Sequence, residues 1–291
     1  MSPSSVPDVS VIVPFKNAEP YVGELLLALS QQQNAPSFEV IAVDNGSSDG
    51  SSHVVEDFGT RLSLRLIRAT ERFSCAYARN VGVRQARAGK FLFIDADDVV
   101  DLTYVGVMAR ALDHFPFVTS RVDSEALNAS SVVEAHGGFW QAEAIGVFFD
   151  FLPAAGSNVG VDSALFRKLG GFCEALTATE DIAFSWEAQL TAGIQIHLVP
   201  DAVYLYRYRE NTRRLFQQTR HWGSNQVKLY SLFRSRGMPP RSWATAAKDW
   251  RAALSAACRP GSRASRAKAA VLLGYCVGRL YGSVQCGVRY L

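Results

Sequence analysis

Residues 91–98 read Phe-Leu-Phe-Ile-Asp-Ala-Asp-Asp, an apolar run that ends in three carboxylates within four positions. A short apolar run of this kind fits a strand that is buried on both faces of a sheet. Carboxylates so close together repel one another and need a cation or hydrogen-bond donors. In open α/β sheets, ligands gather at the carboxyl ends of the strands, and hard cations there bind carboxylates together with substrate phosphates. The segment therefore predicts a metal site, and the alternative is a solvated Asp-rich turn.

The residues around this segment alternate apolar runs with amphipathic stretches, which is typical of βα units that build a parallel sheet. In the first hundred residues we expect strands at 9–13, 38–43, 62–67 and 91–94, with helices starting near Pro20 and spanning 74–87 up to a stop at Gly89. Further on we expect helices around 105–112, 163–169 and 180–192, and strands around 117–122 and 194–200. Residues 206–291 look helical. The predicted fold class is α/β, a mostly parallel central sheet flanked by helices, with a helical C-terminal extension.

Composition limits the class of protein. The chain has 291 residues, of which 48% are hydrophobic, so it can bury a large core. The first residues lack a basic and apolar leader, and no window holds 18 uninterrupted apolar residues, so we expect a cytoplasmic protein. Its five cysteines are odd in number and include no Cys-x-x-Cys pair, which argues against a disulfide framework and a zinc site.

Charge is unevenly distributed along the chain. Residues 1–205 carry 13 Lys/Arg and 25 Asp/Glu, whereas residues 206–291 carry 17 Lys/Arg and 2 Asp/Glu. A basic segment of this density implies an anionic partner, which could be a membrane surface, a diphosphate or a nucleic acid. Scattered aromatic residues argue against nucleic acid. Residues 259–291 fit an amphipathic helix lying peripherally on an anionic membrane, and the alternative is a helix packed on the protein itself.

A second loop supports the carboxylate cluster. Residues 44–50 read Asp-Asn-Gly-Ser-Ser-Asp-Gly and follow the second predicted strand. In a parallel sheet this loop and the carboxylates would converge on one crevice. Asp44 and Asn45 can hydrogen-bond a base or ribose, and Gly46 lets backbone approach a ligand closely. A plain Asx/Gly turn explains the loop equally well when it is taken alone.

Five segments, in order, resemble the motif series of family 2 glycosyltransferases, and the resemblance covers roughly residues 9–200. These are 9–17, 43–50, 78–80, 95–98 with its Asp-x-Asp motif, and 170–172 together with 180–181. The resemblance implies a GT-A fold, a nucleotide-diphosphate-sugar donor, a divalent cation (Mn²⁺ or Mg²⁺), and inversion at the anomeric carbon. It divides the chain into a catalytic domain, 1–205, and a basic helical region, 206–291, that would face the acceptor or a membrane.

By this resemblance the donor-binding residues would be Pro14, Asn17, Asp44, Asn45, Arg79, Asp95, Asp97 and Asp98. Asp97 would be the main metal ligand, and Asp95 would hold the ribose directly or through the metal. Asp98 would lie near the sugar or orient its neighbour. Many relatives carry a second Asp where this chain has Asn45, so the nucleobase stays undecided.

The acceptor hydroxyl needs a base near the anomeric carbon. Asp181 matches the family's base position, at the start of a predicted helix whose N-terminus would favour the ionised carboxylate. The alternative is that Glu180 and Asp181 merely complement the helix dipole. Weaker acceptor-binding candidates are Asn158, Glu180 and Arg209. Residues 218–222 resemble the QxxRW acceptor motif of processive relatives with one position offset, and we favour helix packing for them.

The leading interpretation is an inverting, metal-dependent glycosyltransferase that acts on a glycan, a cell-envelope polysaccharide precursor or a lipid-linked acceptor. A sugar nucleotidyltransferase would share the fold and the metal, but its Gly-rich activating loop is absent, since residues 14–18 read Pro-Phe-Lys-Asn-Ala. A non-catalytic, membrane-associated scaffold with the same fold is the alternative outside enzymes. Intact Asp95, Asp97 and Asp181 argue against it.

Overall fold

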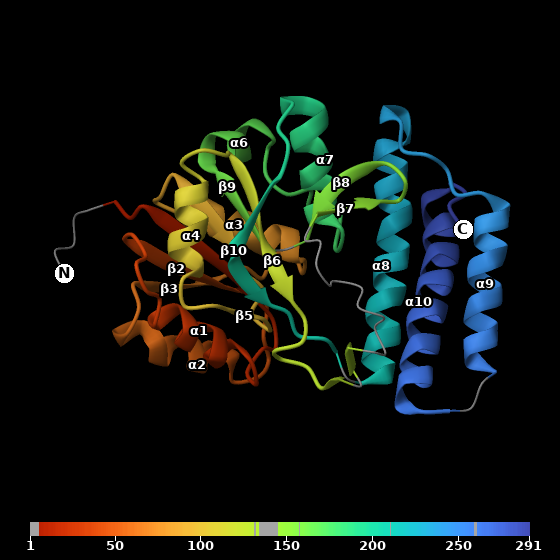
Figure 1. Ribbon diagram of the computed structural model, residues 1–291, viewed down its shortest axis with the longest axis horizontal. Helices are drawn as coiled ribbons and strands as arrows, with labels where there is room; N and C mark the ends of the chain where they lie inside the picture. Colours follow the sequence, from red (N-terminus) through yellow and green to blue (C-terminus); the bar gives the residue numbers. More distant parts are fainter. Residues whose placement is uncertain (1–5, 131, 134–144, 157, 210, 259–260) are drawn as a thin grey trace.

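A computed structural model describes residues 6–130, 132–133, 145–156, 158–209, 211–258 and 261–291 (Figure 1). Its centre is an eight-stranded sheet with the strand order β3-β2-β1-β4-β9-β6-β10-β5. The strands are β1 (Val9–Phe15), β2 (Phe38–Asp44), β3 (Leu64–Arg68), β4 (Lys90–Phe93), β5 (Val99–Val100), β6 (Phe117–Asp123), β9 (Val159–Asp162) and β10 (His197–Leu205). A separate hairpin pairs β7 (Ile145–Phe148) with β8 (Leu152–Ala155).

The sheet is mostly parallel, as the sequence predicts. Strands β3, β2, β1 and β4 run parallel to one another, and β6 runs parallel to β10. Strand β9 is antiparallel to both β4 and β6, and short β5 is antiparallel to β10. The carboxylate segment leaves the sheet at the end of β4, next to the ends of β1 and β2, because Ile12 is in register with Phe93 and Phe15 with Asp44.

Helices cover both faces of the sheet (Figure 1). Alternate residues of β1 point to opposite sides, so Val11 packs in one core and Ile12 in the other. The first core includes α1 (Val22–Ser30), α2 (Ser51–Asp57) and α4 (Tyr104–Ala111). The second includes α3 (Cys75–Gln85), α6 (Ser163–Lys168) and α7 (Glu180–Ala192).

Some boundaries differ from the prediction. Helix α3 ends at Gln85 rather than at the predicted Arg87, because buried Glu39 accepts hydrogen bonds from the Arg87 backbone (2.9 Å) and side chain (3.0 Å) and holds the chain out of the helix. The last predicted strand begins later, at His197, and continues to Leu205 past an irregularity between Val199 and Val203. Pro200 lies in that irregularity, since proline has no N–H to donate to the ladder. Helix α2, strand β9 and the β7–β8 hairpin were not predicted.

The C-terminal region forms three long helices beside the sheet domain: α8 (Thr212–Phe233), α9 (Trp243–Ala257) and α10 (Arg263–Cys286) (Figure 1). Helix α10 packs directly against α8 through glycines. A Cβ at Gly278 would lie 2.1 Å from the Arg220 carbonyl oxygen, and a Cβ at Gly274 would lie 2.0 Å from Thr219 Oγ1. Only glycine lets the two backbones approach this closely. Of the two alternatives for residues 259–291, the described part therefore shows packing on the protein.

Candidate active site

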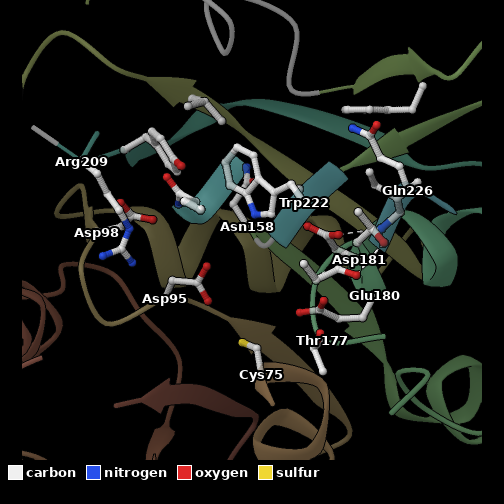
Figure 2. A pocket seen from close by; sticks show the side chains of 18 of the residues that line it. Cys75, Asp95, Asp98, Asn158, Thr177, Glu180, Asp181, Arg209, Trp222 and Gln226 are labelled. Atoms are coloured by element: carbon white, nitrogen blue, oxygen red, sulfur yellow. Dashed lines mark hydrogen bonds between the residues drawn. The ribbon is translucent and has the colours of Figure 1, made fainter. Parts of the chain in front are cut away.

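A cavity of about 510 Å³ lies where the sheet domain meets the three C-terminal helices. Eight residues predicted from the sequence line it: Arg79, Asp95, Asp97, Asp98, Asn158, Glu180, Asp181 and Arg209. Figure 2 shows Asp95, Asp98 and Arg209 on one side in that view, and Glu180 and Asp181 on the other, with Trp222 and Asn158 between them. The proposed metal and base residues, far apart in the sequence, thus share one cavity.

Asp98 holds the loop that follows β4 in place. Its Oδ2 accepts a hydrogen bond from the Tyr204 hydroxyl (2.8 Å), and its Oδ1 accepts one from the Arg207 backbone N–H (2.7 Å). The Tyr204 hydroxyl also accepts from the Asp95 N–H (3.1 Å). Burial and the neighbouring Asp97 and Asp95 carboxylates raise the pKa of Asp98 well above its usual range. Asp98 is therefore placed to orient its neighbours.

Asp95 and Asp97 present carboxylates to the cavity. Their side chains are 29% and 36% exposed. Burial and the Asp95 charge raise the pKa of Asp97, while Arg209, with its Nη2 3.6 Å from Asp97 Oδ2, acts against that rise. No cluster of three or more His, Cys, Asp or Glu suited to a metal occurs among the described residues. Two carboxylates nevertheless fit Mg²⁺ or Mn²⁺, which take one or two carboxylates and complete their shell with water and substrate phosphates.

Arg79 joins the two sides of the cavity. Its Nη2 donates to Asp95 Oδ1 and its Nη1 to Glu180 Oε1, both at 2.6 Å. The Arg79 side chain is 2% exposed and that of Glu180 is 6% exposed. Such a buried, charge-assisted pair is strong when both partners are present. The arginine was predicted to lie near the diphosphate, and the structure gives its guanidinium the role of fixing Asp95 and Glu180.

Asp181 lies at the start of α7, preceded by a strained residue. Thr179 has φ 64°, a left-handed conformation that is unfavourable for a β-branched residue and that clusters at functional sites. Asp181 Oδ1 accepts a hydrogen bond from the Ile182 N–H (2.8 Å). Burial and the neighbouring Glu180 raise the pKa of Asp181 to about 7, against the lowering effect of Arg79. A carboxylate with such a pKa is suited to take a proton near neutral pH.

The chain also matches known proteins. Residues 10–137 match the model of glycosyl transferase family 2. TarS, a poly(ribitol-phosphate) β-N-acetylglucosaminyltransferase of Staphylococcus aureus, is 28% identical over 200 residues, 68% of this chain and 35% of TarS. The glycosyltransferase AglE of Haloferax volcanii is 25% identical over 236 residues, 79% of this chain and 77% of AglE. Over this region the chain is therefore similar to family 2 glycosyltransferases.

Solved structures resemble this chain in fold. The mannosyltransferase PcManGT from Pyrobaculum calidifontis, in complex with GDP-Man and Mn²⁺, matches with a TM-score of 0.62 at 19% identity, over 96% of this chain and 88% of that one. TarS 1–349 with UDP matches with a TM-score of 0.54 at 20% identity, over 98% and 93%. At such identities the likeness concerns the fold, which is GT-A as predicted. The chain spans about a third of the length of full TarS.

Four predicted donor residues do not line the cavity: Pro14, Asn17, Asp44 and Asn45. Pro14 lies within β1 and Asp44 is the last residue of β2, while Asn17 and Asn45 lie in the loops that follow these strands. Asp44 accepts from the Ser47 N–H (2.7 Å) and the Ser52 hydroxyl (2.7 Å). Asn45 donates to the carbonyls of Ala69 (2.6 Å) and Arg72 (2.8 Å). Asn17 Oδ1 accepts from the Ser48 N–H (2.8 Å). These residues shape the loops beside the cavity.

The weaker acceptor candidates differ in their surroundings. Asn158 is 4% exposed, and its amide donates to Ser120 O (3.0 Å) and Oγ (2.9 Å), so it is tied to the middle of β6. The Arg209 side chain is 45% exposed and points its guanidinium toward Asp97. Arg209 is therefore the freer of the two to contact a ligand.

The C-terminal helical region contributes residues that the sequence did not single out. They are Gln226, Arg241, Tyr275 and Arg279, together with Gln218 and Trp222 of the segment predicted to serve helix packing. Trp222 packs against Tyr275 of α10, and Trp222 and Gln218 also line the cavity, four residues apart on one face of α8. The near-match to the acceptor motif was the sequence signal for them. Nothing in the local sequence marks Arg241 or Arg279 as neighbours, because they meet at Asp249 only when α9 and α10 pack beside α8.

Proposed function

We propose that this protein transfers one sugar from a nucleotide-diphosphate-sugar to a hydroxyl of a glycan, polysaccharide precursor or lipid-linked acceptor, with inversion of configuration. The observation that carries the proposal is that Asp181 shares one cavity with Asp95 and Asp97. A base is needed on the acceptor side and paired carboxylates on the donor side, and transfer requires both within reach of one anomeric carbon.

On the donor side, Asp97 and Asp95 would hold Mn²⁺ or Mg²⁺ together with the diphosphate. A bound cation supplies positive charge that offsets the negative charge developing on the departing phosphate. PcManGT is a solved neighbour with GDP-Man and Mn²⁺, and TarS structures contain UDP or UDP-GlcNAc. These complexes support a nucleotide-sugar donor and a divalent cation for this chain, and they leave the nucleobase and the sugar open. We assign the nucleobase and the ribose of the donor to the loops around Asn17, Asp44 and Asn45.

On the acceptor side, Asp181 would accept the proton of the attacking hydroxyl. Attack on the face opposite the leaving diphosphate inverts the anomeric carbon. Arg79 and Glu180 would keep this carboxylate aligned with the donor, since Arg79 holds Asp95 and Glu180 at 2.6 Å each. TarS is named for transfer to poly(ribitol phosphate), which supports a cell-envelope polymer as one acceptor class.

Purified protein incubated with a panel of UDP-, GDP- and dTDP-sugars tests this proposal. We expect nucleotide binding and slow donor hydrolysis that depend on Mn²⁺ or Mg²⁺ and are strongly reduced in Asp97→Ala. Glu125→Ala, an acidic change outside the cavity, is the matched control and should retain both. Absence of binding and hydrolysis for every donor in the panel would remove the proposal's main support.

We also propose that residues 259–291 contribute to peripheral binding at an anionic membrane. No helix among the described residues is long and apolar enough to cross a bilayer. Packing of α10 on α8 leaves Leu280, Tyr281 and Val284 exposed, and Trp243 on α9 is exposed as well. Basic residues of the same region would supply attraction to anionic lipid, which salt screens. Cosedimentation of the protein with anionic vesicles should weaken as salt is added. It should also weaken in the double variant Leu280→Ser/Val284→Ser. Unchanged vesicle binding of that variant would show that the membrane contact does not lie on residues 259–291.

A further inference from the structure

Helix α8 is bonded to the short segment that precedes α7. Residues 177–179 come directly before the helix that carries Asp181, and they line the cavity together with it. In the view of Figure 2, Thr177 lies on the same side of the cavity as Glu180 and Asp181. The side chains that hold Thr177 come from α8, 44 and 48 residues further along the chain.

Both main-chain polar groups of Thr177 are bonded to side chains of α8. The Thr177 N–H donates to Asn225 Oδ1 (3.0 Å), and the Thr177 hydroxyl donates to the same oxygen (3.3 Å). The Thr177 carbonyl oxygen accepts from His221 Nε2 (3.1 Å), since a carbonyl oxygen can only accept. Asn225 and His221 are four residues apart and so lie on one face of α8. One turn of α8 therefore holds Thr177 at both of its main-chain polar groups.

Asn225 is itself fixed in place. It is 1% exposed, and its Nδ2 donates to the His221 carbonyl oxygen (3.0 Å), so each end of its amide has a partner. Leu176, next to Thr177, is buried in a core that it shares with Trp186 of α7 and Val227 of α8. A buried amide with both ends bonded keeps its orientation. The contact between α8 and Thr177 is therefore a rigid one.

The turn that follows Thr177 needs such support. Thr179 has φ 64°, and this left-handed conformation costs a residue with a Cβ roughly 1–2 kcal/mol. Many helices begin with a Ser, Thr, Asp or Asn whose side chain accepts from an N–H of the first turn. In the described structure Thr179 makes no such cap, and its hydroxyl donates to the Ala178 carbonyl oxygen (2.5 Å). A strained turn of this kind persists only where the surrounding contacts enforce it.

This turn leads directly into the acceptor-side carboxylates. Glu180 and Asp181 follow Thr179 in the first turn of α7, and the Ala183 N–H donates to the Thr179 carbonyl oxygen (3.0 Å). The donor side is held by separate contacts, in which Asp98 accepts from the Tyr204 hydroxyl and the Arg207 N–H. Loss of the α8 contacts would therefore displace Asp181 and leave the loop after β4 in place.

We propose that Asn225 and His221 are positioning residues for the base: by holding Thr177 they maintain the left-handed turn at Thr179 and with it the place of Asp181 in the cavity. This inference rests on the proposed function, since it concerns the same site. Neither residue is among those that line the described cavity, so both act through Thr177. The C-terminal helical region thus belongs to the catalytic unit.

Donor hydrolysis and nucleotide binding, measured separately on the full chain with Mn²⁺, test the inference. Asn225→Ala should lower kcat for hydrolysis of an accepted donor, UDP-GlcNAc or GDP-mannose, by roughly 10–100-fold, because misplacement by about 1 Å can cost that much. Affinity for the matching UDP or GDP, measured by calorimetry, should stay unchanged. His221→Ala should also lower kcat, whereas His221→Gln keeps a donor near the position of Nε2 and should retain most of it.

Two further variants separate positioning from loss of stability. Val227→Ala removes buried methyl groups two residues further along α8, and it should lower the free energy of unfolding while kcat is retained. Thr179→Gly, introduced into Asn225→Ala, should restore part of the lost kcat, because glycine adopts the left-handed conformation without strain.

Hydrogen exchange follows the turn without any turnover. In Asn225→Ala the amides of residues 180–183 should exchange faster than in the unchanged protein, because the first turn of α7 is no longer held. The amides of residues 187–191, in the second half of α7, should keep their protection.

Unchanged kcat in both Asn225→Ala and His221→Ala would overturn the inference. It would also be overturned by an equal loss of kcat in Val227→Ala, by unchanged exchange at residues 180–183, or by no restoration in the Thr179→Gly double variant. If Asn225→Ala fails to fold, His221→Ala decides, since His221 is exposed. Failure of the proposed function is recognised separately: the unchanged protein would hydrolyse no donor and bind no nucleotide, and hydrogen exchange would still show whether α8 holds the turn.

Discussion

Asp95 and Glu180 share the guanidinium of Arg79, which donates a 2.6 Å hydrogen bond to each. Asp95 follows β4, and Glu180 begins α7, so a single arginine of α3 fixes the distance between the donor and acceptor sides of the cavity. Glu180 Oε2 has no hydrogen-bond partner in the described structure and depends on Arg79 for compensation of its charge. The alignment on which sugar transfer would depend is thus built into a buried ion triad.

Replacing Arg79 should therefore affect stability as well as activity. Arg79→Leu leaves Glu180 as an uncompensated buried charge, and we expect the free energy of unfolding to fall by about 3–5 kcal/mol. Urea denaturation measures this change. Arg84→Leu, on the exposed side of the same helix, is the control and should change stability by about 0.5 kcal/mol or less. Equal effects of the two variants would contradict the role given to Arg79.

Activity should depend on the ionisation of Asp181. A base acts only when deprotonated, and the pKa of Asp181 is raised to about 7. We therefore expect kcat/KM to rise with pH through about 7 and to fall roughly tenfold per unit below it. Asp181→Asn should lower the rate by about 10²–10⁴-fold and remove this limb of the profile.

Glu187→Gln is the matched control for that measurement, since it changes a carboxylate of the same helix that does not line the cavity. Its pH profile should keep the limb near 7. If kcat/KM of Asp181→Asn still rises with pH near 7, the group that titrates there is a residue other than Asp181.

The Tyr204 hydroxyl should stabilise the loop after β4. It donates to Asp98 Oδ2 (2.8 Å) and accepts from the Asp95 N–H (3.1 Å). Tyr204→Phe leaves buried groups without these partners. We expect the free energy of unfolding to fall by about 1–3 kcal/mol and metal-dependent nucleotide binding to weaken. Tyr281→Phe, at an exposed position on α10, should affect neither quantity measurably. Unchanged nucleotide binding in Tyr204→Phe would mean that this hydroxyl does not support the donor side.

Close packing of α10 on α8 should tolerate no side chain at Gly278. An added Cβ would meet the Arg220 carbonyl oxygen at 2.1 Å, so Gly278→Ala must push the helices apart. We expect the free energy of unfolding, measured by urea denaturation, to fall by about 1–3 kcal/mol. Gly59→Ala, where an added Cβ meets nothing within 4 Å, is the control. Similar stability of both variants would show that the helix contact is looser than described.

The sequence predicted the sheet domain and one side of the cavity, for identifiable reasons. Buried strands read as apolar runs, and the carboxylates follow β4 directly, so both signals are local. Strand β9 was missed because Gly160 and its short length give little signal, although a Cβ at Gly160 would lie 2.8 Å from a Val118 methyl. Arg241 and Arg279 were missed because their meeting at Asp249 depends on the packing of three helices.

The loop after β2 shows a different limit. Asp44 and Asn45 were predicted to face the nucleobase. Their side chains hydrogen-bond protein groups, at Ser47 and Ser52 for Asp44 and at Ala69 and Arg72 for Asn45. An Asx-rich loop can hydrogen-bond a ligand or itself, and the sequence alone does not distinguish the two. Their contact with a nucleotide stays a prediction.

The anomeric configuration of the first sugar released from an α-linked donor tests the central claim most directly. Protein and Mn²⁺ would be mixed with UDP-GlcNAc, and with GDP-mannose in parallel, and followed by ¹H NMR before mutarotation equilibrates the product. We expect metal-dependent release of the β-anomer from a donor that the protein accepts, because Asp181 would direct attack from the face opposite the diphosphate. First release of the α-anomer would contradict it.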